Sequence, residues 1–135
     1  MEFHRGRLID HVHFVVADLE RSKRFYRAVL GALGRELSGE GGDFFFADEL
    51  FVSTGASPTG RTHLALQAAD RAGVDRFHAA GLRAGGRDNG PPGERPYHPG
   101  YYAAFLLDPD GNNVEAVFHG PARRTAESVV ITPAS

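Results

Sequence analysis

Apolar and polar residues alternate near the start of the chain and again 52 residues later. In Ile9–Ala17, one face carries Val12, Phe14 and Val16, and the other carries His11, His13 and Val15. In the later segment, Leu64 and Leu66 alternate with His63, Ala65 and Gln67. Alternation with a period of two is typical of a half-buried β-strand. Each segment is therefore predicted to be a strand with a histidine on its more polar face.

A helical spacing follows each of these strands. Mostly apolar residues fall at helical spacing in both segments: Ser22, Phe25, Tyr26, Val29 and Leu33 in the first, and Val74, Phe77, Gly81 and Leu82 in the second. Asp18 and Asp70 precede the two helices and are suited to cap them. Gly34 and Gly86 stand where each helix is expected to end.

The two segments are copies of one unit. Residues 10–34 and 62–86 align without a gap and share nine identical positions, where chance predicts about two. The shared pairs are His11/His63, Ala17/Ala69, Asp18/Asp70, Arg24/Arg76, Phe25/Phe77, Ala28/Ala80, Leu30/Leu82, Ala32/Ala84 and Gly34/Gly86. The sequence therefore predicts an internal duplication.

Shorter strand patterns complete each copy. They are Arg35–Leu37, Asp43–Ala47 and Glu49–Thr54 in the first half, and a short one near Arg87, Tyr101–Leu107 and Asn113–Phe118 in the second. The turn-rich segment Gly55–Gly60 separates the halves. We predict an α+β fold: two tandem βαβββ modules, residues 8–57 and 61–120, that form one curved mixed β-sheet with helices on its outer face. Residues 1–135 make a single domain with a tail at 121–135.

Two segments lie outside this pattern. Gly85–Gly100 holds five glycines and four prolines, and a long stiff loop of this kind is more often functional than idle. In the tail, Val129–Ile131 is predicted either to add an edge strand or to pack on a partner.

Composition limits the function classes. The 135 residues are 41% hydrophobic and 24% charged, as in ordinary globular domains. The absence of cysteine excludes disulfides, thiolate nucleophiles and Cys-based zinc sites. A net charge of -2 gives no general attraction to nucleic acid, and no apolar run approaches the roughly 18 residues of a membrane span. The first ten residues have no apolar stretch typical of a signal peptide, so we expect a cytoplasmic protein.

The repeated histidines suggest metal chemistry. If the duplicated strands converge, His11 and His63 place two imidazoles near one axis, and imidazole is a common ligand of Zn, Ni, Fe and Mn. Glu115 is a carboxylate in a largely apolar strand and needs a partner, either an arginine or a metal. Together the three residues would form a set of two histidines and one carboxylate with open coordination positions.

Other residues are candidates for supporting roles. His13 shares a face with His11 and is either a proton shuttle or a polar residue that lines a cavity. If the DPDG turn makes a four-residue hairpin loop, Ala104 pairs with Glu115 and Tyr102 shares the Glu115 face, as a general acid or as a wall. Arg95 and His98 either hold an anionic substrate or belong to a solvated loop. Tyr101, beside that loop, is a further candidate substrate contact.

The chain resembles the vicinal oxygen chelate superfamily, which includes glyoxalase I, extradiol dioxygenases, and fosfomycin and bleomycin resistance proteins. The resemblance covers about residues 8–119 and rests on IDHVHFVVADLERSKRFY (9–26), THLALQAAD (62–70) and FLLDPDGNNVEAV (105–117). Residues 86–117 are similar to a single-chain glyoxalase-like branch. By this resemblance, His11, His63 and Glu115 match the family's metal ligands.

The resemblance also implies a cofactor, a partner and an activity. It implies one divalent metal ion per site (Fe, Mn, Ni or Zn), a small-molecule substrate and a homodimer. In some family members, one site takes its ligands from both chains. The first module departs from glyoxalase I, because Phe51 or Val52 stands where that enzyme places a second glutamate, and Glu49 lies at the strand edge.

The leading hypothesis is a metal-dependent enzyme that chelates two oxygens of a small organic substrate, either as a lyase or isomerase or as a ring-cleaving dioxygenase. The alternatives are a metal-free antibiotic-binding protein of the bleomycin-resistance type and a binding protein with a vestigial site.

Overall fold

Two helices and ten strands make up the described part of the computed structural model, which comprises residues 3–122 and 128–132. The elements in chain order are β1 (Phe3–Arg5), β2 (Val12–Val16), α1 (Leu19–Ala32), β3 (Gly39–Glu40), β4 (Phe44–Ala47), β5 (Leu50–Thr54), β6 (His63–Gln67), α2 (Arg71–Arg83), β7 (Arg87–Glu94), β8 (Tyr102–Leu107), β9 (Asn113–Phe118) and β10 (Val129–Ile131). Neither helix is long and apolar enough to cross a membrane within these ranges.

The duplicated βαβββ topology and the α+β class are confirmed. The strands of the first module run in the order β2-β5-β4-β3, and those of the second in the order β6-β9-β8-β7. In each module the first strand pairs in parallel with the last one. The hydrogen bonds divide these eight strands into two four-stranded sheets, with β2 and β6 at their edges, where we expected one curved sheet.

Each helix begins at its predicted cap. The Asp18 carboxylate accepts a hydrogen bond from the Arg21 amide at 3.1 Å, and the Asp70 carboxylate accepts one from the Gly73 amide at 2.7 Å. Gly34 follows α1 with φ 78°, the left-handed conformation that ends many helices. After α2 this conformation falls on Gly85 instead of Gly86, so the second helix ends one residue earlier than the repeat predicts.

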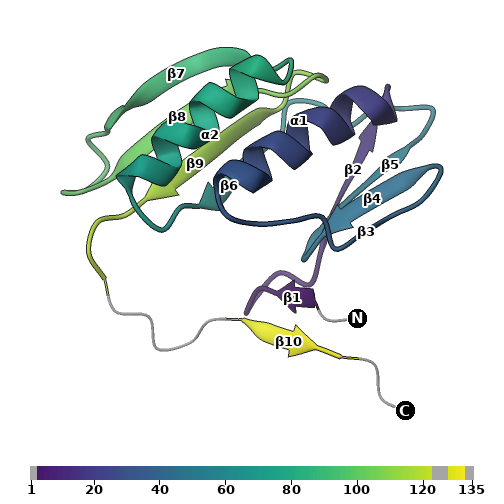
Figure 1. Cartoon of the computed structure of the whole chain (residues 1–135), viewed down its shortest axis with the longest axis horizontal. Helices are drawn as coiled ribbons and strands as arrows, with labels where there is room; N and C mark the ends of the chain where they lie inside the picture. The colour runs from purple at the N-terminus through teal and green to yellow at the C-terminus, as the bar shows by residue number, and fades with distance from the viewer. Residues whose placement is uncertain (1–2, 123–127, 133–135) are drawn as a thin grey trace.

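The helices cover one face of the sheets and leave the other face open. The core contains the inward residues of β2 and β5 and the buried faces of both helices, such as Phe14, Val52, Phe25 and Phe77. In Figure 1, α1 and α2 lie side by side, with α2 in front of β8 and β9, and the two helices contact each other extensively. Side chains that alternate out of the core, such as His63 on β6, lie on the uncovered faces.

Two strand predictions need correction. The segment Arg35–Leu37 is not a strand, and β3 forms later, at Gly39–Glu40, where it pairs with β4. Most of the expected Gly/Pro loop is the eight-residue strand β7, which pairs with β8. An edge strand tolerates Pro91 and Pro92 because half of its amides need no partner in the sheet, and its register shifts at Gly90 and Gly93.

The tail contributes a strand, but not at the edge of either module's sheet. β10 pairs antiparallel with β1, a strand that the sequence analysis did not predict. The two strands lie together away from both larger sheets (Figure 1). Residues 123–127 and 133–135 of the predicted tail lie outside the described residues.

A buried carboxylate joins the two modules. Asp108, 1% exposed, begins the turn between β8 and β9 and accepts a 2.5 Å hydrogen bond from the Tyr26 hydroxyl of α1. It also accepts hydrogen bonds from the amides of Asp110 and Asn112 at 2.9 and 2.8 Å. Burial, together with the charge of Asp108, raises the pKa of Tyr26 well above its ordinary value, so the phenol stays protonated as a donor.

We expect Asp108→Ala to lower the free energy of unfolding by about 3 kcal/mol, because it leaves several buried donors without an acceptor. Tyr26→Phe removes one donor only and is expected to cost about 1 kcal/mol. Urea unfolding followed by circular dichroism at fixed protein concentration measures both. Tyr102→Phe is the matched control, because it breaks an exposed phenol–carboxylate bond to Asp75. An equal loss in all three variants would contradict this account.

Candidate functional site

The structure brings Glu115 and His63 together on the uncovered face of the second sheet. β6 and β9 run in parallel, and Ala65 pairs with Glu115. His63 is two residues before Ala65, so its side chain lies on the same face of the sheet as that of Glu115. His63 Nε2 is 2.7 Å from Glu115 Oε1. The Glu115 side chain is 2% exposed, whereas that of His63 is 54% exposed. The buried Glu115 carboxylate therefore has an exposed imidazole as its neighbour on the solvent side.

Tyr101 occupies the second oxygen of the same carboxylate. It directly precedes β8, and its hydroxyl donates a hydrogen bond to Glu115 Oε2. Burial first, and then the hydrogen bond and charge of Glu115, raise the pKa of Tyr101 to about 12. Tyr101 was a candidate substrate contact, and its hydroxyl is instead engaged by a candidate metal ligand.

His11 lies apart from this pair. It directly precedes β2 in the first sheet, is exposed, and its Nδ1 is 2.6 Å from Asp10 Oδ1. Across residues 3–122 and 128–132, no three His, Asp or Glu side chains are grouped closely enough to hold a metal ion. A single chain thus assembles two of the three predicted ligands.

The first module has a phenylalanine where the second has its glutamate. His13 pairs with Phe51 in the first sheet as Ala65 pairs with Glu115 in the second, and His13 and Ala65 are equivalent in the repeat. His13 Nε2 is 2.7 Å from Ser53 Oγ, and its ring meets Phe51 edge-on at 5.1 Å. Of the two positions considered for a second acid, the register thus selects Phe51.

The expected register of β8 and β9 is wrong by one residue. Phe105 pairs with Glu115, and Leu107 pairs with Asn113. The turn therefore holds one more residue than the four-residue loop that we expected. Because strand faces alternate, Tyr102 lies on the helix-side face, where its hydroxyl donates to Asp75 at 2.7 Å. Tyr101 occupies the place beside Glu115 that we expected Tyr102 to share.

The two loop candidates lie near the pair but do not contact it. The Arg95 guanidinium lies 5.4 Å above the Phe105 ring, which is 6.1 Å from the His63 ring. His98 Nε2 is 2.8 Å from His119 Nδ1, and both imidazoles pack edge-on against Tyr101. Arg95 thus supplies a cation near the open side of the pair, and His98 supports Tyr101.

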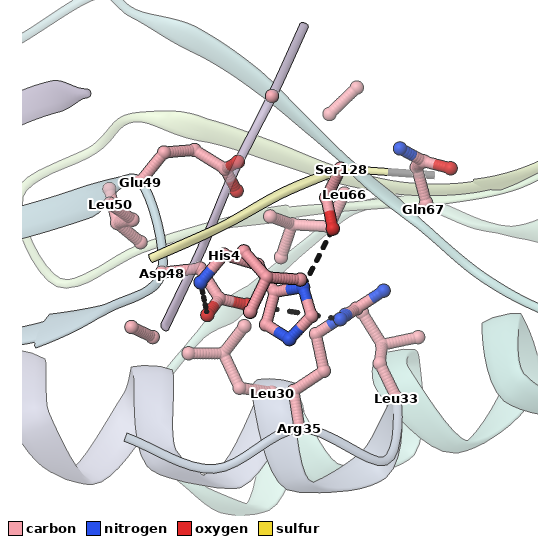
Figure 2. Close-up of a pocket in the computed structure, with 14 residues that line it drawn as sticks. His4, Leu30, Leu33, Arg35, Asp48, Glu49, Leu50, Leu66, Gln67 and Ser128 are labelled. Atoms are coloured by element: carbon pink, nitrogen blue, oxygen red, sulfur yellow. Dashed lines mark hydrogen bonds and ion pairs between the residues drawn. The ribbon is translucent and has the colours of Figure 1, made fainter. Parts of the chain in front are cut away.

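A separate cavity of about 500 Å³ lies between the modules. Figure 2 shows Leu30, Leu50 and Leu66 along it, with His4 bound to Ser128 on one side. Glu49, the acid at the edge of the first-module strand, also lines it. None of the predicted site residues lines this cavity, so it is distinct from the His63–Glu115 pair.

Comparison with known proteins identifies relatives over most of the chain. The family model described as the Glyoxalase/Bleomycin resistance protein/Dioxygenase superfamily matches residues 8–116. A search of curated proteins finds no match. Among solved structures, a glyoxalase/bleomycin resistance protein from Albidiferax ferrireducens T118 is 35% identical, with a TM-score of 0.72, over 82% of this chain and 97% of the other.

Two further structures share the fold at lower identity. A fosfomycin resistance protein from Mesorhizobium loti is 22% identical, with a TM-score of 0.60, over 84% of this chain and 92% of its own. A lactoylglutathione lyase from Agrobacterium tumefaciens is 21% identical, with a TM-score of 0.59, over 84% of this chain and 94% of its own.

The contact between Tyr101 and Glu115 predicts a pH effect. A raised pKa means that the protonated phenol stabilises the fold below pH 10, and that this contribution is lost as the pH rises towards 12. We expect Glu115→Gln to lower the pKa of Tyr101 part of the way towards 10, because burial remains. The ultraviolet absorbance of tyrosinate, compared with that of Tyr101→Phe, isolates this residue. Asp75→Asn is the control and should lower the pKa of Tyr102 alone. An unchanged titration in Glu115→Gln would contradict the prediction.

Proposed function

The chain belongs to the glyoxalase/bleomycin resistance protein/dioxygenase superfamily, and from this premise we propose that it is a divalent-metal-dependent enzyme acting on a small oxygenated organic molecule. The observation that carries the proposal is the His63–Glu115 pair, in which a nitrogen of a half-exposed imidazole lies 2.7 Å from an oxygen of a buried carboxylate. Two neighbouring oxygens of the substrate would bind at the open positions of the metal.

The donor set suits such an ion. An imidazole nitrogen and a carboxylate oxygen on one open sheet face are common ligands of Fe, Mn, Ni and Zn. When bound, the ion acts as a Lewis acid towards the substrate oxygens. Glu115 brings a negative charge that has no Lys or Arg partner among the described residues, so a cation at this position would be favoured.

We propose that the third ligand is His11 of a second copy in a homodimer. The described part of the chain does not group His11 with the other two ligands, and its exposed imidazole is accessible to a partner. Arg95 lies close enough to the open side to attract an anionic substrate. We assign this dimer to the cytoplasm, a proposal that the absence of cysteine supports.

The reaction is proposed to be of the lyase or isomerase type, or a ring-cleaving dioxygenation. Phe51 takes the position of a second acid in the first module, so the proposed site has three protein ligands and not four. This set resembles that of the dioxygenases. It lacks the second glutamate, which a glyoxalase I reaction would need as a base. His13 is the proposed proton shuttle in either case.

Elemental analysis of protein purified without chelator tests the proposal. We expect about one divalent ion per site in the wild type and almost none in His63→Ala or Glu115→Ala, because each variant lacks a ligand. His78→Ala is the matched control, since His78 makes a similar 2.9 Å pair with Asp88 on the other side of the sheet. Wild-type protein that holds no metal, and takes up none when these ions are added, would rule the proposal out.

Mixing two inactive variants tests the shared site. If ligands come from both chains, a heterodimer of His11→Ala and His63→Ala keeps one intact site, made of His11 from one chain and His63 and Glu115 from the other. We therefore expect co-refolded variants to regain metal binding that neither has alone. The pair Glu115→Ala and His63→Ala serves as the control, because no mixed site is then complete. No recovery in the first mixture would overturn the shared site.

An uncovered aromatic surface favours a second candidate function. Phe44, Phe46 and Phe51 have near-parallel rings, with centroids 5.5–6.5 Å apart, on the open face of the first sheet. Gly39 and Gly41 make room for these rings, since a Cβ at either position would lie within 2.6 Å of a ring atom. Such a surface suits a flat apolar molecule, as expected of a metal-free antibiotic-binding protein.

Binding of bleomycin to chelator-treated protein distinguishes this candidate from the enzyme. If the aromatic surface binds drugs without metal, calorimetry should show binding that Phe44→Ala and Phe51→Ala weaken by about tenfold or more. Glu115→Gln is the control and should leave that binding unchanged. The metal-dependent proposal expects no such binding.

A further inference from the structure

Glu115 is an unusual carboxylate, because it is buried and yet has no Lys or Arg partner among residues 3–122 and 128–132. Its side chain is 2% exposed and projects from β9 between strands that are largely apolar. Only two donors reach it in the described structure: the His63 imidazole at Oε1 and the Tyr101 hydroxyl at Oε2. Since an unsatisfied buried carboxylate is costly, each donor contributes to the position of the group.

The two donors differ in access to solvent. His63 is more than half exposed, so it is the donor that would share a metal ion with Glu115. Tyr101 is partly buried and directly precedes the sheet strand β8. A metal would thus take Oε1 together with His63 Nε2, while Oε2 remains on the tyrosine.

The surroundings of Tyr101 hold its ring in place. The imidazoles of His98 and His119 pack edge-on against it at 5.3 and 5.1 Å, and the Tyr97 ring does so at 4.9 Å. Its backbone carbonyl accepts a hydrogen bond from the Arg95 amide at 2.9 Å. Gly100, with φ 87°, provides the left-handed turn immediately before it. Tyr101 is therefore oriented by contacts that do not depend on Glu115.

We propose that Tyr101 is a positioning residue of the metal site, whose hydroxyl holds Glu115 Oε2 so that Oε1 faces the ion beside His63. This inference rests on the proposed function and adds to it a residue that does not itself touch the metal. Hydrogen bonds to a metal-binding side chain orient the ligand, and their loss typically costs 10–100-fold in metal affinity.

Titration of Co²⁺ into chelator-treated protein, followed by calorimetry and by the visible absorption of the bound ion, tests the proposal. We expect Tyr101→Phe to weaken Co²⁺ binding by about 10–100-fold and to change its absorption band, because the carboxylate is no longer held. The variant removes only the hydroxyl, and circular dichroism checks that it remains folded.

Two neighbouring tyrosines provide matched controls. Tyr102→Phe also breaks a phenol–carboxylate hydrogen bond, the one to Asp75 at 2.7 Å, but on the helix-side face. Tyr97→Phe removes a hydroxyl from the exposed ring that packs on Tyr101. Both variants should bind Co²⁺ as the wild type does, with the same absorption band.

The outcomes separate this inference from the proposed function. Wild-type affinity in Tyr101→Phe, or an equal loss in Tyr102→Phe, would overturn the positioning role while the metal site stands. Wild-type protein that binds no Co²⁺ would overturn the metal-dependent function and the positioning role together. Loss in Tyr101→Phe alone, with an altered band, supports the proposal, because a purely structural role would not change the spectrum of the ion.

Discussion

The relative placement of the two modules depends on the hydrogen bonds that the Asp108 carboxylate accepts. It is buried, and it is held by the Tyr26 hydroxyl of one module and by backbone amides of its own turn. Asp110, two residues later, accepts hydrogen bonds from the Ala17 amide and the Ser22 hydroxyl. The DPDG turn, one of the motifs on which the family resemblance rests, therefore connects the two modules in this chain. It also fixes where β9, the strand that carries Glu115, begins.

Glu115 is the second buried carboxylate of the described residues, and it differs from Asp108 in that one of its donors is exposed to solvent. The donors to Asp108 lie inside the protein or in its own turn, so the group is fully occupied. One donor to Glu115 is an exposed histidine, so the proposed metal ion could be held by the carboxylate and this imidazole together. A buried carboxylate thus serves stability at Asp108 and the proposed metal site at Glu115, because access to solvent differs.

Divergence between the repeats concentrates the candidate chemistry in the second module. Phe51 and Glu115 hold equivalent positions, and the first sheet carries an aromatic face where the second carries an acid. The duplicated backbone therefore presents two chemically different surfaces. A second copy that brings His11 to Glu115 would bring the aromatic face with it, since both lie on the first sheet.

The sequence by itself determined the two modules, the capped helices and most strands, because periodicity and capping are local properties. It also indicated that His63 and Glu115 belong together. Only the tertiary structure decided the register of β8 against β9, which a one-residue difference in turn length reverses, so Tyr101 and not Tyr102 meets Glu115. A short strand near Arg87 was predicted, but the full length of β7 and the pairing of β1 with β10 were not. Edge strands form through distant partners, even in segments rich in glycine and proline. The separation of His11 from the pair is likewise a matter of how the sheets are arranged, which no local pattern contains.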